Sequence, residues 1–426
     1  MEKKNTAKPL KYSRVLWYSV MPLLIAAARL IFGARTDKTA RKVYRKTRAP
    51  MLILANHVSP IDFIFVCQAV WPRHISFVVA ENMYYQRFFA WFLDRGGVIW
   101  KKQFLPDFSC VRNIKNQIDA GVDVMLFPEG KVANDGISAP FRRSSAKLIK
   151  WLNCPVAVMN ICGAGVSNPK WAVKRNRKGR VETTVKVVLS AEETQNLSQV
   201  EIFRKISAAI EHNEHEWQQR RGLKFRSARF AEGLENILFK CPVCGESYTF
   251  DSKNDVIECA NCGLRVRYCN DGSLVPLNAD AARGNTANKE AGSFSSSVPD
   301  RIDRWSVWQR ACVRKEAESS ADFSAAEEVS VMIPDEKARK MTVAGKGTLT
   351  LTRGSLTYDG TLNGEKTQLT FGTEFLYTVA CQPGKGLDLY DDNNIYHFRF
   401  KERRAPYFFV TVIEEIYGIK HPESQE

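Results

Sequence analysis

The 426-residue sequence lacks the features of a polytopic membrane protein, a repeat protein or a low-complexity chain. Only residues 15–32 approach the length and apolarity of a membrane span, so the several spans of a transporter are missing. No internal repeat is recognisable. Apolar residues make up 44% and charged residues 25%, which excludes a wholly disordered or collagen-like chain. The length exceeds the ~250–300 residues at which single cores stop growing, and therefore predicts several domains.

Acidic residues are scarce near the N-terminus. The chain carries 62 Lys and Arg against 46 Asp and Glu, a net charge of +16. The first fifty residues hold thirteen Lys and Arg but only Glu2 and Asp37, a net charge of +11. This concentration of positive charge indicates an anionic partner, either membrane headgroups or nucleic acid.

Residues 15–32 form one apolar stretch that is interrupted by Arg29. As a helix it would be about 27 Å long, close to the thickness of the hydrocarbon core. A basic leader also resembles a signal peptide, but no clean small-residue cleavage site precedes the basic segment 41–48. We predict that residues 1–49 form a membrane-associating segment with an interfacial or shallowly inserted helix. The alternative is an ordinary amphipathic helix packed on the domain.

Short apolar runs alternate with amphipathic stretches over residues 50–235. Six runs are predicted to be strands: 51–55, 75–80, 98–100, 122–127, 156–161 and 181–189. Apolar residues between the runs recur at helical spacing, as at Phe108, Val111, Ile114 and Ile118. The alternation predicts an α/β domain with a mixed sheet and flanking helices.

Residues 56–62, Asn-His-Val-Ser-Pro-Ile-Asp, follow a predicted buried strand and open a helix. Ser59, Pro60 and Asp62 fit a capping box with proline at the first helical position, so the segment could be only a helix start. That interpretation leaves His57 unexplained. A residue just before the helix can fold back over the first turn, where Asp62 could accept a hydrogen bond from one imidazole nitrogen. The other nitrogen would then be free to take a proton from a hydroxyl.

Residues 127–130, Phe-Pro-Glu-Gly, lie at the carboxyl end of another predicted strand, the edge at which α/β sheets place their sites. Such a turn can aim Glu129 into a crevice, while Gly130 lets a ligand approach the backbone. Lys102 ends a neighbouring strand and Arg142 follows the Glu turn, and both are suited to a phosphate. The alternative for these cations is a solvated surface.

Four features occur along the chain in this order: His57-x4-Asp62, the Gly-rich strand end from Gly96-Gly97 to Lys102, Phe-Pro-Glu-Gly at 127–130 and a Pro-Val-Ala-Val strand at 155–158. Together they resemble the four motifs of the glycerolipid acyltransferases. The resemblance to 1-acylglycerol-3-phosphate (lysophospholipid) acyltransferases extends over about residues 10–220. It implies that His57 is the general base that deprotonates the acceptor hydroxyl, and that Asp62 orients it. The hydroxyl oxygen would then attack a fatty-acyl thioester of coenzyme A or acyl carrier protein.

The same resemblance assigns Glu129 and Gly130 to the glycerol-phosphate acceptor site, with Lys102 where the family commonly has an arginine. Two departures concern this site. After Phe-Pro-Glu-Gly the family usually continues Thr-Arg, whereas this chain reads Lys-Val from Lys131. Lys131 can supply the cation, but as a point charge rather than a bidentate fork. The fourth motif has Val158 where a second proline is common. The departures leave the acceptor headgroup open.

Eleven cysteines, an odd number, do not suggest a secreted disulfide framework, and we expect a cytosol-facing protein. Four of them form two CxxC pairs separated by fourteen residues: Cys241, Cys244, Cys259 and Cys262. Four thiolates at this spacing predict a closed, structural Zn²⁺ site in a zinc ribbon over residues 236–276. The alternative is thiol–disulfide chemistry.

Other chemically capable side chains are predicted to be structural or solvated. Four cysteines lie in apolar stretches and are expected in the core: Cys67, Cys110, Cys154 and Cys162. His212 and His215 lie three apart on a predicted polar helix, 200–217, with no third ligand nearby. We therefore expect both histidines at the surface.

The C-terminal half changes in character. Residues 277–300 are rich in small and polar residues and predict a linker, and residues 301–328 predict a helical connector. Over 329–426, strict alternation and the turn signals Asp359-Gly360 and Asn363-Gly364 predict antiparallel strands closed by one helix. This pattern resembles pleckstrin-homology-like (PH-like) domains, which bind lipid headgroups or proteins.

The leading hypothesis is an acyltransferase on the cytoplasmic face of a membrane. It would acylate a lysophospholipid, 1-acylglycerol-3-phosphate, to give phosphatidic acid. The rival is a non-catalytic membrane or nucleic-acid adaptor built on an acyltransferase scaffold, which the net charge and the ribbon support. The excess charge lies in the first fifty residues rather than on the ribbon, and His57, Asp62 and Glu129 are all present. The enzyme is therefore favoured, with an anionic membrane as partner and nucleic acid not expected.

Overall fold

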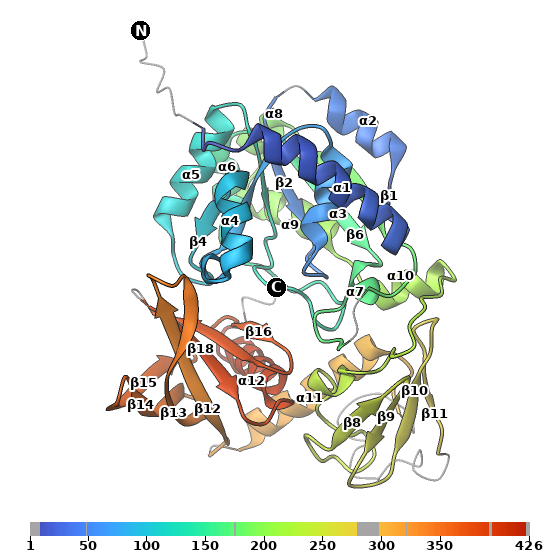
Figure 1. Ribbon diagram of the computed structural model, residues 1–426, viewed down its shortest axis with the longest axis vertical. Coiled ribbons are helices and arrows are strands. Elements are labelled where there is room, and N and C mark those ends of the chain that lie inside the picture. Colours follow the sequence, from blue (N-terminus) through green and yellow to red (C-terminus); the bar gives the residue numbers. More distant parts are fainter. Residues whose placement is uncertain are drawn as a thin grey trace. The chain divides into compact units, whose positions relative to one another are not determined.

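The computed structural model describes residues 9–47, 49–173, 176–278, 298–320, 322–391 and 394–422. The chain divides into two compact units, which are described separately (Figure 1). Unit 1 consists of Met1–Asn168 and Asn176–Trp217. Unit 2 consists of Pro169–Arg175 and Gln218–Glu426. Most of the predicted linker 277–300 lies outside the described residues.

Unit 1 is built around a seven-stranded mixed sheet, as predicted. Its strands have the order β1-β7-β6-β2-β5-β3-β4, and β7 runs antiparallel to β6. Their bounds are Arg35–Thr36 (β1), Leu52–Ala55 (β2), Ile75–Ala80 (β3), Ile99–Lys101 (β4), Asp123–Leu126 (β5), Val156–Cys162 (β6) and Glu182–Leu189 (β7). All six predicted strands are confirmed to within one residue, whereas the two-residue β1 was not predicted.

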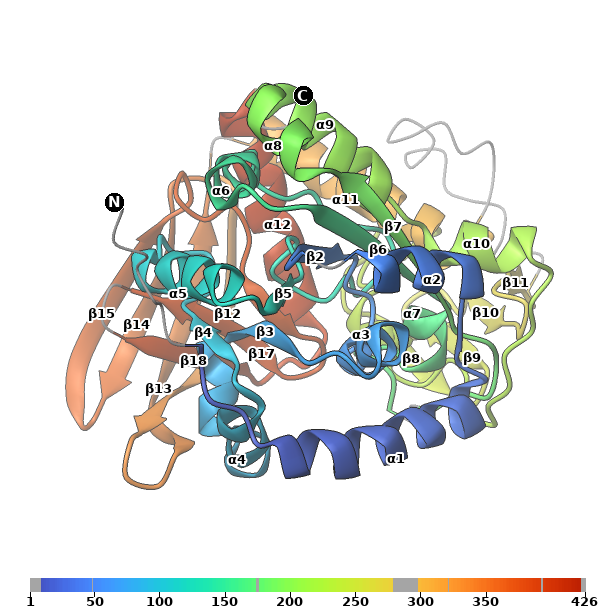
Figure 2. The same ribbon diagram turned by 90° about the horizontal axis from the view of Figure 1, so that it is seen from above.

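Helices cover both faces of this sheet (Figure 2). Ile53 and Ala55 of β2 face a core shared with α1 (Arg14–Phe32), α2 (Lys38–Lys46) and α3 (Asp62–Val70). Leu52 and Leu54 face the opposite core, shared with α5 (Phe108–Asp119), α6 (Ser144–Leu152) and α9 (Gln199–Ile210). Because both faces are buried, β2 is a continuous apolar run rather than an alternating one. The remaining helices of this unit include η1 (Glu81–Tyr85), α4 (Arg87–Gly96), α7 (Ala164–Ser167) and α8 (Ala191–Asn196).

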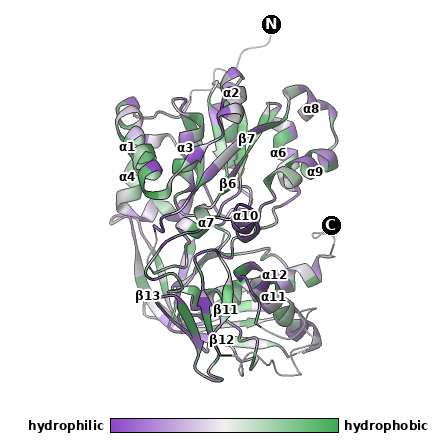
Figure 3. Ribbon diagram, turned by 90° about the vertical axis from the view of Figure 1, so that its right-hand side faces the viewer, coloured by the Kyte–Doolittle hydropathy of each residue, from purple (hydrophilic) through white to green (hydrophobic). Residues whose placement is uncertain are grey.

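The N-terminal apolar stretch is helix α1, which is long and apolar enough to cross a membrane. One face packs on the sheet domain through Trp17, Ile25, Ala28 and Phe32. The other face is exposed, with Leu23 69% and Leu30 83% accessible, and Figure 3 shows hydrophobic residues along the helix. The helix therefore packs on the domain with one face and presents apolar side chains outward with the other.

Unit 2 contains a four-stranded antiparallel sheet, a helix and a larger β-rich region. The small sheet comprises β8 (Phe250–Lys253), β9 (Val256–Cys259), β10 (Arg265–Tyr268) and β11 (Leu274–Pro276). Helix α11 (Ile302–Ser319) follows and buries Trp305 and Trp308. It is shorter than the predicted helical stretch 301–328, because residues from Ser324 onward pair with the next strand instead. Cross-strand pairing thus decides the structure of this segment.

The β-rich region of unit 2 is a seven-stranded antiparallel sheet with one C-terminal helix, α12 (Ala405–Lys420). Its strands are β12 (Ser324–Asp335), β13 (Lys340–Thr352), β14 (Ser355–Leu362), β15 (Glu365–Gly372), β16 (Ala380–Gln382), β17 (Gly386–Tyr390) and β18 (Ile395–Phe400). Asn363 and Gly364 form the predicted hairpin turn, both with positive φ. The Asp359-Gly360 turn prediction is wrong, because both residues lie inside β14. A Cβ on Gly360 would lie 2.6 Å from the Cα of Gly347, so this glycine permits close strand contact.

Asp123 ties three elements of unit 1 together. The buried carboxylate accepts hydrogen bonds from the Tyr44 hydroxyl (2.6 Å), the Met51 amide (3.0 Å) and the Arg73 guanidinium (2.9 Å). These donors belong to α2, the residue before β2 and the loop before β3. Removing the carboxylate would leave buried donors without a partner.

We expect Asp123→Ala to lower the free energy of unfolding by about 3–5 kcal/mol, the usual cost of breaking a buried charged network. Urea unfolding followed by circular dichroism measures this. The matched control is Asp119→Ala in the same unit, because Asp119 is exposed and pairs with Lys115 only at the surface. Equal stability of the two variants would contradict the assignment.

Candidate functional site

His57 and Asp62 meet at the carboxyl end of β2. The Nδ1 atom of His57 lies 2.9 Å from Oδ2 of Asp62, and the imidazole stacks on the Phe127 ring with centroids 4.0 Å apart. The Asp62 side chain is fully buried, whereas that of His57 is 20% exposed. Burial raises the pKa of Asp62, while hydrogen bonds from His57 and from the Ser59 and Val58 amides act in the opposite direction. The pair thus joins a buried carboxylate to a partly accessible imidazole.

The local backbone is more than a helix start. Helix α3 begins at Asp62 itself, and the hydroxyl of Ser59 donates to the Asn168 carbonyl (2.9 Å) instead of accepting from the helix. Only half of the predicted capping box forms, since Asp62 Oδ2 accepts from the Ser59 amide (2.9 Å). The same oxygen accepts from the Val58 amide (2.8 Å). Asp62 therefore shapes the loop that carries His57.

Glu129 lies against the backbone of this loop. Its Oε1 accepts from the His57 amide (3.0 Å) and its Oε2 from the Ala139 amide (2.9 Å). Burial raises the pKa of Glu129 to about 8, although the two amides and the nearby Lys131 charge act to lower it. Both carboxylate oxygens are thus engaged by the protein, so Glu129 braces the loops around His57.

The remaining residues of the predicted acceptor site have different surroundings. Gly130 has a φ of 71°, and a Cβ there would lie 3.1 Å from the Phe104 ring. The glycine is therefore required by the turn and by Phe104. Lys102 precedes Gln103, whose side chain donates to the Gly130 carbonyl (2.7 Å). Arg142 is exposed, two residues before α6.

Two histidines predicted at the surface are buried. Helix α9 ends at Ile210 rather than continuing to residue 217, and the following turn directs His212 and His215 inward. Glu214, at the start of α10 (Glu214–Arg220), is also fully buried. The cluster of ionisable residues in Glu-His-Asn-Glu-His-Glu could have indicated a buried polar site. The same composition is typical of a solvated helix, so the sequence did not separate the two. The four cysteines expected in the core are buried, as predicted.

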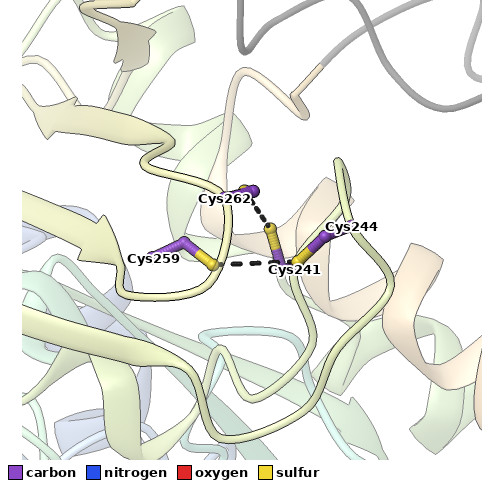
Figure 4. Close-up of side chains that lie close together, drawn as sticks. All are labelled: Cys241, Cys244, Cys259 and Cys262. Atoms are coloured by element: carbon purple, nitrogen blue, oxygen red, sulfur yellow. Dashed lines mark hydrogen bonds between the residues drawn. The ribbon is translucent and has the colours of Figure 1, made fainter.

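The four CxxC cysteines converge in unit 2 (Figure 4). Their sulfur atoms all lie within 4.8 Å of one another, with 3.7 Å between Cys241 and Cys262 and 3.8 Å between Cys244 and Cys259. These separations are too long for disulfides. Zn–S bonds of about 2.3 Å in a tetrahedron place sulfurs about 3.8 Å apart, so the cluster fits a Zn²⁺ ion.

Comparisons with known proteins match parts of the chain. A profile of the acyltransferase family matches residues 35–161. The chloroplastic 1-acyl-sn-glycerol-3-phosphate acyltransferase BAT2 of Brassica napus is 22% identical over 137 residues, which are 32% of this chain and 39% of that protein. The chain thus spans well under half the length of this relative.

A solved structure is also similar. It is the 1-acyl-sn-glycerophosphate (LPA) acyltransferase PlsC from Thermotoga maritima, with 16% identity and a TM-score of 0.39. The match covers 46% of this chain and 78% of the other. The family profile thus places an acyltransferase-family region at residues 35–161, and part of the chain is similar to a plant 1-acyl-sn-glycerol-3-phosphate acyltransferase.

Proposed function

We propose that the protein is a membrane-associated O-acyltransferase. It moves a fatty-acyl group from acyl-coenzyme A or acyl carrier protein to the hydroxyl of a lysophospholipid. The proposed acceptor is 1-acylglycerol-3-phosphate, and the product is phosphatidic acid. The observation that carries the proposal is the His57–Asp62 hydrogen bond (2.9 Å) within an acyltransferase-family domain.

The proposed mechanism uses His57 as general base. Asp62 engages Nδ1, which holds the proton there and leaves Nε2 to accept the proton of the acceptor hydroxyl. Among the described residues, Nε2 has no hydrogen-bond partner. The hydroxyl oxygen attacks the thioester carbonyl, the C–S bond breaks, and the imidazolium gives the proton to the leaving thiolate, which departs as the free thiol. A thioester is already activated, so the reaction needs no covalent enzyme intermediate. A positioned general base accelerates such a step by ~10²–10⁴-fold.

The acceptor phosphate is assigned to cationic side chains. Glu129 already accepts two backbone amides, so its proposed role is to brace the site. Lys131, whose charge acts on Glu129, is the proposed first contact for the phosphate, supported by Lys102 and Arg142. A lysine binds phosphate as a point charge, so the orientation of the phosphate is less restricted than with a bidentate arginine.

The membrane and unit 2 complete the proposal. The exposed apolar face of α1 and the basic N-terminal segment would hold the protein on the cytoplasmic face of an anionic membrane, at ~1 kcal/mol per basic residue near the surface. The four cysteines would hold a structural Zn²⁺ in the ribbon. The seven antiparallel strands and α12 support a PH-like domain.

We expect His57→Ala to lower kcat by at least ~10²-fold, because it removes the proposed base. Asp62→Asn should also lower kcat strongly, because an amide cannot stabilise the imidazolium. Radiolabelled acyl transfer in detergent or liposomes measures both. His421→Ala, which removes a half-buried histidine of unit 2, is the control. Turnover of His57→Ala at the wild-type rate would eliminate the base assignment.

Metal analysis of the purified protein should find about one Zn²⁺ per chain. Cys262→Ser should lower the zinc content and the thermal midpoint of unit 2, whereas Cys269→Ser should change neither. Because the site is proposed to be structural, chelation should act through unfolding. A folded metal-free protein that regains lost turnover on adding Zn²⁺ would contradict that role.

The outer face of α1 can be tested by point substitution, because the inner face is part of the core. The double variant Leu23→Asp/Leu30→Asp should reduce co-sedimentation with vesicles containing phosphatidylglycerol at least several-fold, since it places charges on the apolar face. Val200→Asp is the matched control, an equally exposed apolar residue on α9. Unchanged sedimentation of the double variant would refute the membrane role of this face.

A further inference from the structure

The turn after α9 contains a buried carboxylate that the proposed mechanism does not use. Glu214 is fully buried, and its Oε2 accepts a 2.6 Å hydrogen bond from the Gly163 amide. Its Oε1 accepts a longer one, 3.4 Å, from the Gly165 amide. The carboxylate thus fastens the segment that follows β6, which includes the short helix α7.

This segment packs directly on the loop that carries His57. A Cβ built on Gly165 would lie 3.2 Å from Cγ of Glu214 and 3.2 Å from both Cβ and the carbonyl oxygen of Val58. Gly165 is therefore held between Glu214 and the residue after His57. The Val58 amide in turn donates to Asp62 Oδ2. A continuous set of contacts runs from Glu214 to the carboxylate that orients His57.

The same turn holds the loop on the other side of the site. The Ser138 amide donates to the His212 carbonyl (2.9 Å), and the His212 amide donates to the Ser138 hydroxyl (3.0 Å). The Glu214 amide donates to the Gly136 carbonyl (2.9 Å). Ala139, which follows Ser138 in this loop, donates its amide to Oε2 of Glu129. One turn thus clamps both loops that surround His57.

The His212 side chain is the ionisable neighbour of this buried carboxylate. Its Nε2 lies 3.6 Å from Oε1 of Glu214, and its Nδ1 lies 3.9 Å from the Cys162 sulfur. Burial lowers the pKa of His212, but Cys162 and Glu214 together outweigh burial and raise it to about 10. The His212 imidazole and the Glu214 carboxylate thus lie side by side in the interior of unit 1.

We propose that Glu214, paired with His212, is a positioning residue for the acyl transfer: it presses the Gly163–Gly165 segment against the His57–Asp62 loop. The inference rests on the proposed function. Glu214 does not touch the reacting atoms, and it acts by holding Val58 and hence Asp62 in place.

Two substitutions test the clamp from opposite sides. Glu214→Gln keeps the size, but its NH₂ group must face one of the two glycine amides, so two donors meet. Gly165→Ala inserts a methyl group between Glu214 and Val58, while alanine favours helix over glycine by about 1 kcal/mol. We expect both to lower kcat at least tenfold with KM for the acyl donor unchanged within twofold. The thermal midpoint of Gly165→Ala should be retained.

The matched controls lie in the same unit. Glu193→Gln alters an exposed glutamate that caps α8 and pairs with Lys205. Gly96→Ala adds a methyl group that meets only Val98 at an ordinary 3.8 Å. Both controls should keep wild-type kcat. Wild-type kcat in Glu214→Gln or Gly165→Ala, or a kcat loss that only parallels a loss of thermal midpoint, would overturn the inference.

Amide hydrogen exchange gives a readout that does not depend on turnover. Peptides covering residues 57–62 should exchange faster in both test variants than in wild type and in the controls. If wild type transfers no acyl group to any lysolipid, the proposed function fails, and exchange still decides whether Glu214 holds the His57 loop. Unchanged exchange in residues 57–62 would overturn the inference in either case.

Discussion

The His57 site depends on the hydrogen bonds made by one fully buried carboxylate, that of Asp62. Asp62 has lost its water, which makes an isolated charge costly. Its Oδ2 meets that cost with three donors: His57 Nδ1 and the amides of Val58 and Ser59. The same hydrogen bonds that satisfy the charge fold the loop back over the first turn of α3. The imidazole is thereby fixed, and its second nitrogen is left available at a partly exposed position.

Around this interaction, the surrounding loops are held by backbone contacts. Glu129 accepts amides from both the His57 loop and residue 139, and Phe127 supports the flat face of the imidazole. Such contacts cost no side-chain freedom at the moment of reaction, because they are made before substrate arrives. The sheet supplies a rigid base, since the site lies at the carboxyl ends of β2 and β5.

Much of this arrangement is visible in the sequence. Continuous apolar runs predict the strands because both faces of the sheet are covered. The place of His57 just before a helix start, where it can fold back over the first turn, predicts its contact with Asp62. The sequence is less informative where tertiary contacts decide. His212 and Glu214 follow a helix that was expected to continue, and only its end at Ile210 turns them inward. Asp359-Gly360 has the composition of a turn, but a close approach to Gly347 makes it part of a strand. Gly130 predicts a backbone that a ligand can approach, yet the Phe104 ring occupies the space beside it.

The central claim is that this chain acylates a lysophospholipid. The most direct measurement is mass-spectrometric identification of products after wild-type protein is incubated with acyl-coenzyme A or acyl carrier protein and a panel of lysolipids in liposomes. The account predicts a diacylated product, with phosphatidic acid formed most rapidly from 1-acylglycerol-3-phosphate. No acylated product from any pair of donor and acceptor would contradict it. The acyltransferase-family domain would then be a scaffold for a membrane-binding or nucleic-acid-binding adaptor.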